Sequence, residues 1–383
     1  MNNVSKVCIL TSAHSARDVR IFHKEAKTLC DAGYKITLIA QHENDISMEG
    51  IDIIALPRPK NRFNRMILTT WKIFRIAKKQ KADVYHFHDP ELIPAGLLLS
   101  ITGNIVIYDV HENLPGQILS KGWIPKKLRI IASWLMKHIE AFAAKRLSAI
   151  ITTSEKINNR FIKFNSKTIT ARNYPLLSEL SVTSQNDFNK NIEHKDSSNK
   201  TIVSLGGINS ARCSNEIVQA VGLLSSDLKI KLIIGGACSS NSLFEEIRSL
   251  SGWACTSYCG QLPRIEAMAL LKKSYIAFII YSPAPNHYEV RSNRLFESMA
   301  AGVPVITSNF PEWREIIEGN KCGLCVDPLN PSEIAKAIDY ILTHPEEAQQ
   351  MGKNGRRAVQ ERYNWSIEEK KLLALYEKLL HKA

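Results

Sequence analysis

The sequence lacks the features of membrane-spanning and secreted proteins. No apolar run approaches the roughly 18–20 residues that are needed to cross a bilayer. The first ten residues carry Lys6 inside a short apolar stretch and show no small-residue cleavage site, so we expect no signal peptide. Eight cysteines in 383 residues are too few for a disulfide framework, which indicates a reducing compartment. We therefore expect a cytoplasmic protein.

Acidic residues are missing from two long stretches, residues 53–82 and 113–139. The formal net charge is +13, and all of that excess lies in the first half. Residues 1–173 hold 27 Lys and Arg against 14 Asp and Glu, whereas residues 174–383 hold 23 of each kind. Such an asymmetry indicates that one domain approaches an anionic surface.

The length predicts two domains, because 383 residues exceed what one ordinary core organises. Hydrophobic residues make up 44% of the chain and charged residues 23%, which excludes a disordered protein. Between Ser178 and Lys200 the composition turns to Ser, Asn, Asp, Lys and Thr, which is typical of a linker. The predicted parts are a first domain over 1–177, a linker over 178–200, a second domain over 201–360, and a C-terminal helix over 361–383 that packs back on the first domain.

Both domains show β-branched runs that alternate with helical segments, a pattern typical of βα units on a parallel sheet. The first domain has predicted strands at residues 6–10, 35–40, 83–88, 104–110 and 149–153, and predicted helices at 19–32, 66–79, 92–100 and 126–148. The second has predicted strands at 201–205, 229–234, 276–281 and 303–307. We therefore predict two Rossmann-like domains with a cleft between them, and ligands at the carboxyl ends of the strands.

A pair of glycines after a predicted strand is the first candidate phosphate site. Gly206 and Gly207 permit close backbone approach, and the helix that follows offers unpaired N–H groups to an anion. Arg212 has the bidentate fork that clamps a pyrophosphate. A plain strand-to-helix turn with an exposed arginine is an equally good interpretation of these residues alone.

A pair of acids marks the second candidate site. Glu289 and Glu297 are eight residues apart, which leaves them within about 80° of each other on a helix, so both can face one ligand. Ser292 and Asn293 fall in the first turn, where the free N–H groups bind a cap or an anion. A solvated pair of glutamates is the more common explanation for such spacing on its own.

At this motif the sequence resembles a known family. Glu289 and Glu297, followed by the run Met-Ala-Ala-Gly-Val-Pro-Val-Ile over 299–306, resemble the signature of retaining glycosyltransferases of family 4, which have the GT-B fold. Further similar segments are residues 14–25, 86–92, 108–112, 172–175 and 363–376, which look like a bacterial polysaccharide-assembly branch. The resemblance covers nearly the whole chain outside residues 178–200.

The resemblance implies roles for individual residues on the donor side. Glu289 matches the acid that meets the hydroxyls of the donor sugar, and Glu297 matches the acid that holds the ribose. Arg212 matches a basic residue on the diphosphate, and Arg291 or Arg294 could replace a second one that residues 206–210 lack. The predicted donor-binding residues are Gly206, Gly207, Arg212, Arg291, Ser292, Asn293, Arg294 and Glu297.

The resemblance also implies a catalytic centre in the first domain. His111 matches the active-site histidine near the anomeric carbon, so His111 and Glu289 are the predicted catalytic pair. The predicted acceptor contacts are Asp18, Arg20, His88 and Glu112. The chain has no Asp-x-Asp motif, the usual metal handle of the other large glycosyltransferase fold, so we expect no metal cofactor. The family implies retention of configuration, and with no second carboxylate placed as a nucleophile, front-face attack is expected.

Two other features suggest different partners. His86 and His88 alternate on one face of a strand beside Asp89, a spacing seen in metallohydrolases, although polar groups lining a cleft are more common. Trp123 and Trp134, with Lys121, Lys126 and Lys127, form a basic aromatic stretch suited to an anionic membrane surface. In this interpretation Leu128, Ile131, Leu135, Ile139 and Phe142 are buried. Nucleic acid is a weaker candidate because no nucleic-acid module is recognisable.

These observations predict a retaining glycosyltransferase that moves a sugar from a UDP- or GDP-sugar to a saccharide acceptor. We expect the acceptor to be lipid-linked, at the inner face of the cell membrane, in the synthesis of a bacterial surface polysaccharide. The alternatives are a metal-dependent hydrolase or deacetylase using His86, His88 and Asp89, a non-catalytic nucleotide-sugar-binding scaffold, and an enzyme of the same fold that hydrolyses or epimerises the donor.

Overall fold

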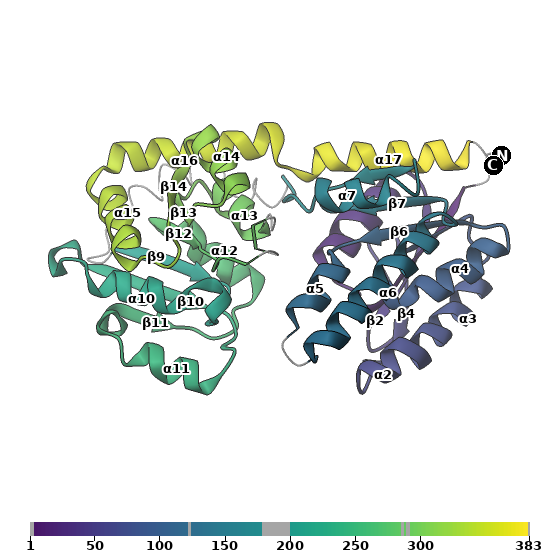
Figure 1. The fold of residues 1–383 in the computed structure, drawn as a ribbon. Coiled ribbons are helices and arrows are strands. Elements are labelled where there is room, and N and C mark those ends of the chain that lie inside the picture. Colours follow the sequence, from purple (N-terminus) through teal and green to yellow (C-terminus); the bar gives the residue numbers. More distant parts are fainter. Residues whose placement is uncertain (1–3, 122–123, 178–199, 285–286, 289–291, 382–383) are drawn as a thin grey trace. The chain divides into compact units, whose positions relative to one another are not determined.

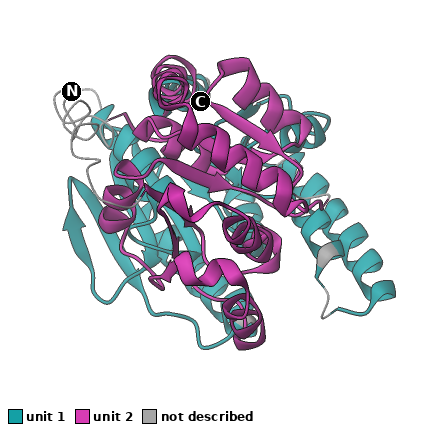
Figure 2. Ribbon diagram, turned by 90° about the vertical axis from the view of Figure 1, so that its left-hand side faces the viewer, with its two compact units in different colours: residues 1–173, 365–383 teal, residues 174–364 magenta. Residues whose placement is uncertain are grey.

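The computed structural model describes residues 4–121, 124–177, 200–284, 287–288 and 292–381 (Figure 1). The chain divides into two compact units, of which unit 1 holds residues 1–173 and 365–383 and unit 2 holds residues 174–364 (Figure 2). Each unit is a parallel-sheet α/β layer structure, which confirms the predicted fold class. The predicted linker lies outside the described residues, apart from Lys200 at its end.

Unit 1 is built on an eight-stranded sheet in the order β3-β4-β2-β1-β5-β6-β7-β8. The pair β3–β4 is antiparallel and the other neighbours are parallel. The strands are β1 (Lys6–Ser15), β2 (Lys35–Gln41), β3 (Ile46–Met48), β4 (Ile51–Leu56), β5 (Val84–Phe87), β6 (Ile105–Val110), β7 (Ala149–Thr152) and β8 (Thr168–Thr170). The strands β5 and β7 are buried along their whole length, as expected when helices cover both faces of a sheet.

The helices of unit 1 connect these strands. They are η1 (Val19–Ala26), α1 (Lys27–Asp31), α2 (Arg62–Asn64), η2 (Arg65–Thr69), α3 (Thr70–Gln80), η3 (Pro90–Leu92), α4 (Ile93–Ile101), α5 (Leu114–Ser120), α6 (Lys126–Ala144), α7 (Glu155–Phe161) and α17 (Trp365–Leu380). Among them η1 and η2 are π-helices and η3 is a 3₁₀-helix. Helices α3, α4, α6 and α5 lie side by side over one face of the sheet (Figure 1).

Unit 2 has a six-stranded, fully parallel sheet in the order β11-β10-β9-β12-β13-β14. The strands are β9 (Lys200–Leu205), β10 (Ile230–Gly235), β11 (Thr256–Tyr258), β12 (Ile276–Ile279), β13 (Val305–Ser308) and β14 (Gly323–Val326). The helices are η4 (Ser210–Arg212), α10 (Ser214–Gly222), η5 (Ser226–Leu228), α11 (Asn241–Arg248), η6 (Ser251–Cys255), α12 (Arg264–Lys272), α13 (Asn293–Ala301), α14 (Pro311–Asn320), α15 (Pro331–Thr343) and α16 (Pro345–Arg362). Helix α13 ends at Gly302, whose left-handed backbone (φ 73°) is a common helix stop.

The C-terminal helix predicted over residues 361–383 is α17, which begins at Trp365 and belongs to unit 1 as expected. The chain forms α16 in unit 2 and a separate α17 in unit 1, with Tyr363 and Asn364 between them. The buried Asn364 side chain donates hydrogen bonds to the carbonyls of Val359 and Gln360, and so caps the end of α16. Helix α17 contacts η1 and β8 of unit 1, where the indole Nε1 of Trp365 donates to Thr28.

Candidate active site

The glycine turn after β9 is shaped by close backbone packing. Gly207 has φ +83°, and a Cβ there would collide with the carbonyl oxygen of Ala237. Gly236, after β10, has φ +128°, and a Cβ there would meet the amide of Gly207. The two turns therefore lie backbone against backbone at the carboxyl edge of the sheet, and only glycine fits both the conformation and the space.

Two arginines meet at this turn. The Arg212 guanidinium lies where a Cβ of Gly206 would be, and its Cζ lies 4.8 Å from the centre of the Tyr281 ring. Arg294, in the first turn of α13, donates through Nη1 to the carbonyl of Leu205. Leu205 adjoins Gly206, so both guanidinium groups lie at this turn, and burial and then repulsion from Arg212 lower the pKa of Arg294. Of the two predicted substitutes for a second diphosphate contact, Arg294 is next to Arg212, and Arg291 lies outside the described residues.

A cavity of about 420 Å³ is lined by Arg294 and by Leu205, whose carbonyl Arg294 binds. Helix α13 lines it with Asn293, Arg294, Glu297 and Ser298, and the cavity also reaches the turn after β10. Glu297 is partly exposed, and its Oε1 accepts a 3.0 Å hydrogen bond from Arg264. Ser292 is buried at the N-cap but makes no capping bond through its side chain. Glu289, the second member of the predicted acidic pair, lies outside the described residues.

His111 lies in unit 1, directly after β6. Its side chain is 21% exposed, and its Nε2 is 3.0 Å from Nδ1 of His88. The Thr153 hydroxyl donates to the His111 carbonyl at 2.7 Å and fixes the backbone there. Burial is the main cause that lowers the pKa of His111, so the ring is neutral at neutral pH. Glu112, next in sequence, is exposed and accepts a hydrogen bond from Gln117.

The two acceptor candidates in the first loop have different surroundings. Asp18 caps η1 by accepting from the amides of Arg20 and Ile21, and it pairs with His14 at 3.3 Å. Burial opposes the charge of Asp18, but bonds from His14 and Ile21 outweigh it and lower its pKa to about 2. The Arg20 side chain is only 3% exposed and pairs with Asp109 at 2.8 Å, so it holds unit 1 together and presents no surface to an acceptor.

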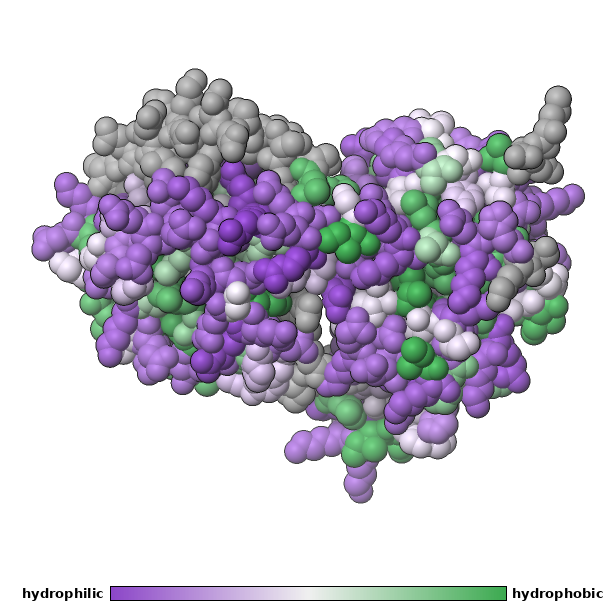
Figure 3. All heavy atoms as spheres, turned by 90° about the horizontal axis from the view of Figure 1, so that it is seen from above, coloured by the Kyte–Doolittle hydropathy of each residue, from purple (hydrophilic) through white to green (hydrophobic). Residues whose placement is uncertain are grey.

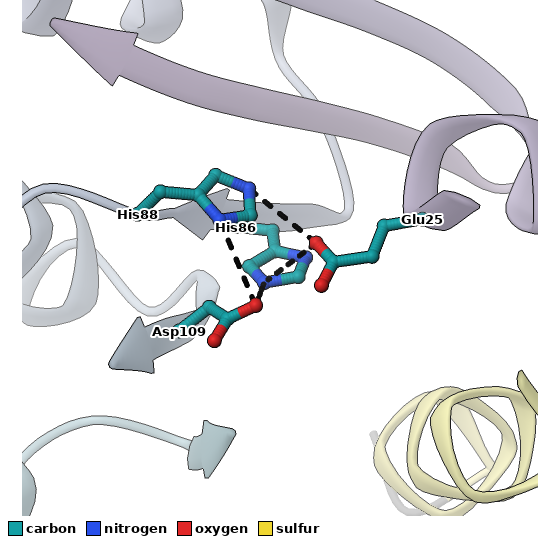
Figure 4. A group of neighbouring side chains, drawn as sticks. All are labelled: Glu25, His86, His88 and Asp109. Atoms are coloured by element: carbon teal, nitrogen blue, oxygen red, sulfur yellow. Dashed lines mark ion pairs between the residues drawn. The ribbon is translucent and has the colours of Figure 1, made fainter. Parts of the chain in front are cut away.

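His86 and His88 were expected to lie beside Asp89 as metal ligands, but the structure gives them other partners. His86 and His88 lie with Glu25 and Asp109 in one buried group (Figure 4). Asp89 is elsewhere: its Oδ2 accepts from the amides of Ser12 and Ala13 and from the Thr11 hydroxyl, and so supports the C-terminal half of β1. His88, predicted as an acceptor contact, is likewise buried.

Glu25 was missed by sequence reasoning, and its spacing explains why. Arg20 and Glu25 are five residues apart, which puts them about 140° apart around an α-helix. In the π-helix η1 the repeat is longer, and Arg20 Nε lies 2.9 Å from Glu25 Oε1. Arg264 and Tyr281 were missed as well, since neither belongs to a motif that marks it.

The membrane-docking prediction falls on α6, whose apolar side chains are exposed rather than buried. The buried face of α6 is made of Ser133, Glu140, Ala143 and Ala144. Ser133 donates to the carbonyl of Pro115, and Glu140 pairs with Arg160. The buried face of α6 is therefore made of small side chains and of polar side chains that have a partner. The side chains that were expected to be buried are instead 37–59% exposed, namely Leu128, Ile131, Leu135, Ile139 and Phe142.

The outward face of α6 is therefore broader than predicted. Trp134 is 59% exposed, Lys126 and Lys127 are exposed, and Lys121 is partly exposed, whereas Trp123 lies outside the described residues. By contrast, hydrophilic side chains predominate in the view of Figure 3, and the hydrophobic ones are scattered among them. Within the described residues, no helix combines the length and apolarity needed to span a bilayer.

Two family models match the chain in tandem. The model of glycosyl transferases group 1 matches residues 185–358, and the model of Glycosyltransferase Family 4 matches residues 19–171. The chain is a GT-B glycosyltransferase of group 1 type. In this glycosyltransferase the Family 4 match falls in unit 1, and the group 1 match falls in unit 2.

Individual proteins resemble this glycosyltransferase in sequence or in fold. The spore coat protein SA of Bacillus subtilis (strain 168) is 38% identical over 84 residues, and the match spans only 22% of each protein. A sucrose-phosphate synthase from Thermosynechococcus elongatus has a TM-score of 0.74 at 18% identity and covers 100% of both chains. HepE from Anabaena, solved in complex with UDP and glucose, has a TM-score of 0.71 at 13% identity and covers 98% of this chain and 100% of its own. At such identities the structural likeness establishes the fold.

Proposed function

We propose that the protein transfers a sugar from a nucleotide-sugar donor to a saccharide acceptor with retention of configuration and without a metal cofactor. The observation that carries the proposal is the pair Arg212 and Arg294 on the glycine turn, beside a cavity that Glu297 lines. Two guanidinium groups held close together need an anion between or beside them, and a diphosphate supplies it. HepE, which shares the fold, was solved with UDP.

The proposed chemistry breaks the bond between the anomeric carbon and the diphosphate oxygen. Negative charge then develops on the leaving diphosphate, where Arg212, Arg294 and the N-terminal end of α13 stabilise it. The acceptor hydroxyl forms the new bond on the same face of the sugar, and its proton passes to the leaving phosphate. Glu297 holds the ribose, Glu289 the sugar hydroxyls, and His111 contacts the sugar near the reacting carbon.

A thermal-shift experiment tests the donor site. The full chain is melted with UDP-, GDP- and ADP-sugars, with and without EDTA, alongside Arg212→Ala and Glu297→Ala. At about 100 times its Kd a ligand adds about 2.7 kcal/mol to stability, which a melt registers. We expect one nucleotide class to raise the Tm regardless of EDTA, and both substitutions to reduce the shift. Arg248→Ala is the matched control, because Arg248 is an exposed arginine of the same unit that pairs with Glu245.

The outcomes separate the candidate functions. Donor binding followed by transfer of labelled sugar to an acceptor supports the transferase, whereas binding without turnover supports a scaffold. Turnover of the donor without an acceptor supports a hydrolase or epimerase. No shift with any nucleotide, together with a Tm that EDTA lowers, would overturn the proposal in favour of a metal enzyme.

We further propose that the acceptor is lipid-linked and that unit 1 docks on the inner face of the cell membrane during synthesis of a surface polysaccharide. The support is the outward face of α6, where exposed apolar side chains alternate with lysines, in a segment without acidic residues from 113 to 139. Such a surface fits an anionic bilayer, where apolar groups insert and lysines pair with headgroups.

Vesicle co-sedimentation tests the docking. We expect the protein to bind vesicles that contain an anionic lipid, and to bind neutral phosphatidylcholine vesicles weakly. The double substitution Ile130→Ser, Trp134→Ser should abolish the binding. Ile265→Ser is the control, because Ile265 is 84% exposed but lies in unit 2, away from any basic apolar stretch. Equal binding of both variants would refute the assignment of α6.

A further inference from the structure

The contact behind His111 is with another imidazole. Nδ1 of His88 lies 3.0 Å from Nε2 of His111, within hydrogen-bond distance. The His88 ring is fully buried, whereas the His111 ring is 21% exposed and reaches the surface. His88 follows β5, and its amide donates to the carbonyl of Leu10 at 3.2 Å, so its backbone is held by the sheet. The partly exposed His111 ring therefore contacts the His88 ring, whose backbone is fixed by the sheet.

Two carboxyl groups surround the His88 ring on its buried side (Figure 4). Nε2 of His88 lies 3.6 Å from Glu25 Oε2, and Nδ1 lies 3.6 Å from Asp109 Oδ2. His86 stacks on His88 with ring centres 4.7 Å apart, and its Nδ1 lies 2.9 Å from the hydroxyl of Tyr376 in α17. A continuous set of polar side chains thus runs from α17 to His111.

A divalent metal ion is disfavoured in this group by a cation that is already present. Arg20 donates to Asp109 Oδ2 from Nε at 3.0 Å and from Nη2 at 2.8 Å, and it pairs with Glu25 at 2.9 Å. A metal ion among the same oxygens would be repelled by the guanidinium. The unpartnered Nε2 atoms of His86 and His88 therefore need a different explanation.

The charges around the rings favour one arrangement of protons. Burial lowers the pKa of His86 to about 4 and also lowers the pKa of His88, so both rings are neutral at neutral pH. Burial and the neighbouring Asp109 raise the pKa of Glu25, whereas Arg20 outweighs burial at Asp109 and holds the pKa of that carboxyl well below its usual range. A neutral imidazole has one N–H and one bare nitrogen, so the proton position on one ring fixes that of its hydrogen-bonded neighbour.

We propose that His88 is a positioning residue that holds His111 in the Nε2–H tautomer and fixes the orientation of its ring. His88 carries its own proton on Nε2, toward the Glu25 carboxyl oxygen, so its Nδ1 accepts the hydrogen bond from His111. The bare Nδ1 of His111 is then available to accept a hydrogen bond from a substrate hydroxyl. Glu25, His86 and Tyr376 maintain the orientation of His88 from behind. The inference depends on the proposed function only for the statement that His111 acts on a sugar.

The tautomer can be measured independently of activity. The full chain, labelled with ¹⁵N-histidine, gives long-range ¹H–¹⁵N correlations in which protonated and bare ring nitrogens are distinguished. The chain has 11 histidines, and the signal lost in His111→Gln assigns His111. We expect a protonated Nε2 and a bare Nδ1 for His111. A protonated Nδ1 in the native protein would overturn the proposal, as would one equivalent of tightly bound metal shared by Glu25, His86, His88 and Asp109.

Two substitutions of His88 provide the matched comparison. His88→Asn keeps a polar atom near the place of Nδ1, whereas His88→Leu removes it at similar size. We expect His88→Leu to mix the two His111 tautomers and to lower kcat about 10- to 100-fold, by analogy with the range found for partners that orient metal-ligating histidines. We expect His88→Asn to keep more of both properties, and neither variant to change the donor-induced Tm shift.

The failures of the two proposals remain distinguishable. A native protein that transfers no sugar would refute the proposed function, but the NMR comparison would still decide the role of His88. An unchanged His111 pattern in a folded His88→Leu would refute the role of His88 even in an active enzyme. If His88→Leu does not fold, the native tautomer and the His88→Asn pattern decide the question.

Discussion

Replacing Arg20 with leucine should destabilise unit 1 strongly, and in a pH-dependent way. The side chain is 3% exposed, and Asp109, its partner, is fully buried. The substitution removes both guanidinium hydrogen bonds to Asp109 and the ion pair with Glu25. The remaining Asp109 charge is then buried with no cation beside it, a situation that costs about 3–5 kcal/mol.

A second argument gives a similar magnitude and a direction with pH. The variant can protonate Asp109, which at pH 7.5 costs about 5 kcal/mol for a carboxyl of ordinary pKa near 3.9, at about 1.4 kcal/mol per pH unit. In the native protein burial would raise the pKa of Asp109, but Arg20 outweighs burial and holds the pKa well below its usual range. The Arg20–Asp109 ion pair therefore stabilises the native protein above about pH 4, and this stabilisation is lost only below that pH. When the pH falls from 7.5 to 5.5, the loss in free energy of unfolding caused by Arg20→Leu should therefore shrink by up to about 2.7 kcal/mol.

Urea unfolding with hydrogen exchange of peptides from β1 and β6 measures the stability of unit 1 apart from unit 2. Lys27→Met is the control, because the Lys27–Asp31 pair is at the surface and is expected to contribute less than about 1 kcal/mol. The double substitution Arg20→Leu, Asp109→Asn should recover part of the loss by removing the buried charge. An Arg20→Leu deficit below about 1 kcal/mol at pH 7.5, or one that does not shrink at pH 5.5, would refute the reasoning.

Three further predictions follow from single residues. Tyr376→Phe should cost about 1 kcal/mol in urea unfolding, because it leaves His86 Nδ1 buried without its 2.9 Å partner. Gly207→Ala should lower the Tm and the donor affinity, since its φ of +83° and the Ala237 carbonyl leave no place for a Cβ, whereas Gly319→Ala in α14 meets nothing within 4 Å and should be neutral or stabilising. Burial raises the pKa of Cys213 and Cys322 to about 12, so mass spectrometry should find native modification by a thiol reagent at the exposed Cys255 and Cys259 and none at the two buried thiols.

The sequence predicted the sheets well where β-branched runs are buried on both faces, as in β7 and β13. It missed short strands such as β3 and β8, which have only three residues each and leave little periodicity to detect. The orientation of α6 was wrong because apolar spacing was taken to mark the buried face, whereas packing is made by Ser133, Ala143 and Ala144.

The candidate site was predictable where a local motif carries it. The glycine turn, Arg212 and Glu297 stand in recognisable segments, and the structure brings Arg294 to Arg212. The buried group around His88 was not predictable, because its members come from η1, β5, β6 and α17 and meet only in the folded chain. The π-helix η1 makes the group still harder to predict, because it brings together Arg20 and Glu25, which are five residues apart.

The return of α17 to unit 1 has a consequence for biosynthesis. A ribosome makes residues 1–173 first, but Thr28 and His86 then lack the Trp365 and Tyr376 groups that bond to them. All of unit 2 emerges before those partners do, and unit 2 is formed from one uninterrupted stretch of chain. The half that is synthesised first is therefore the last to be completed, and a nascent chain stalled before residue 365 would expose the η1 surface to chaperones or proteases.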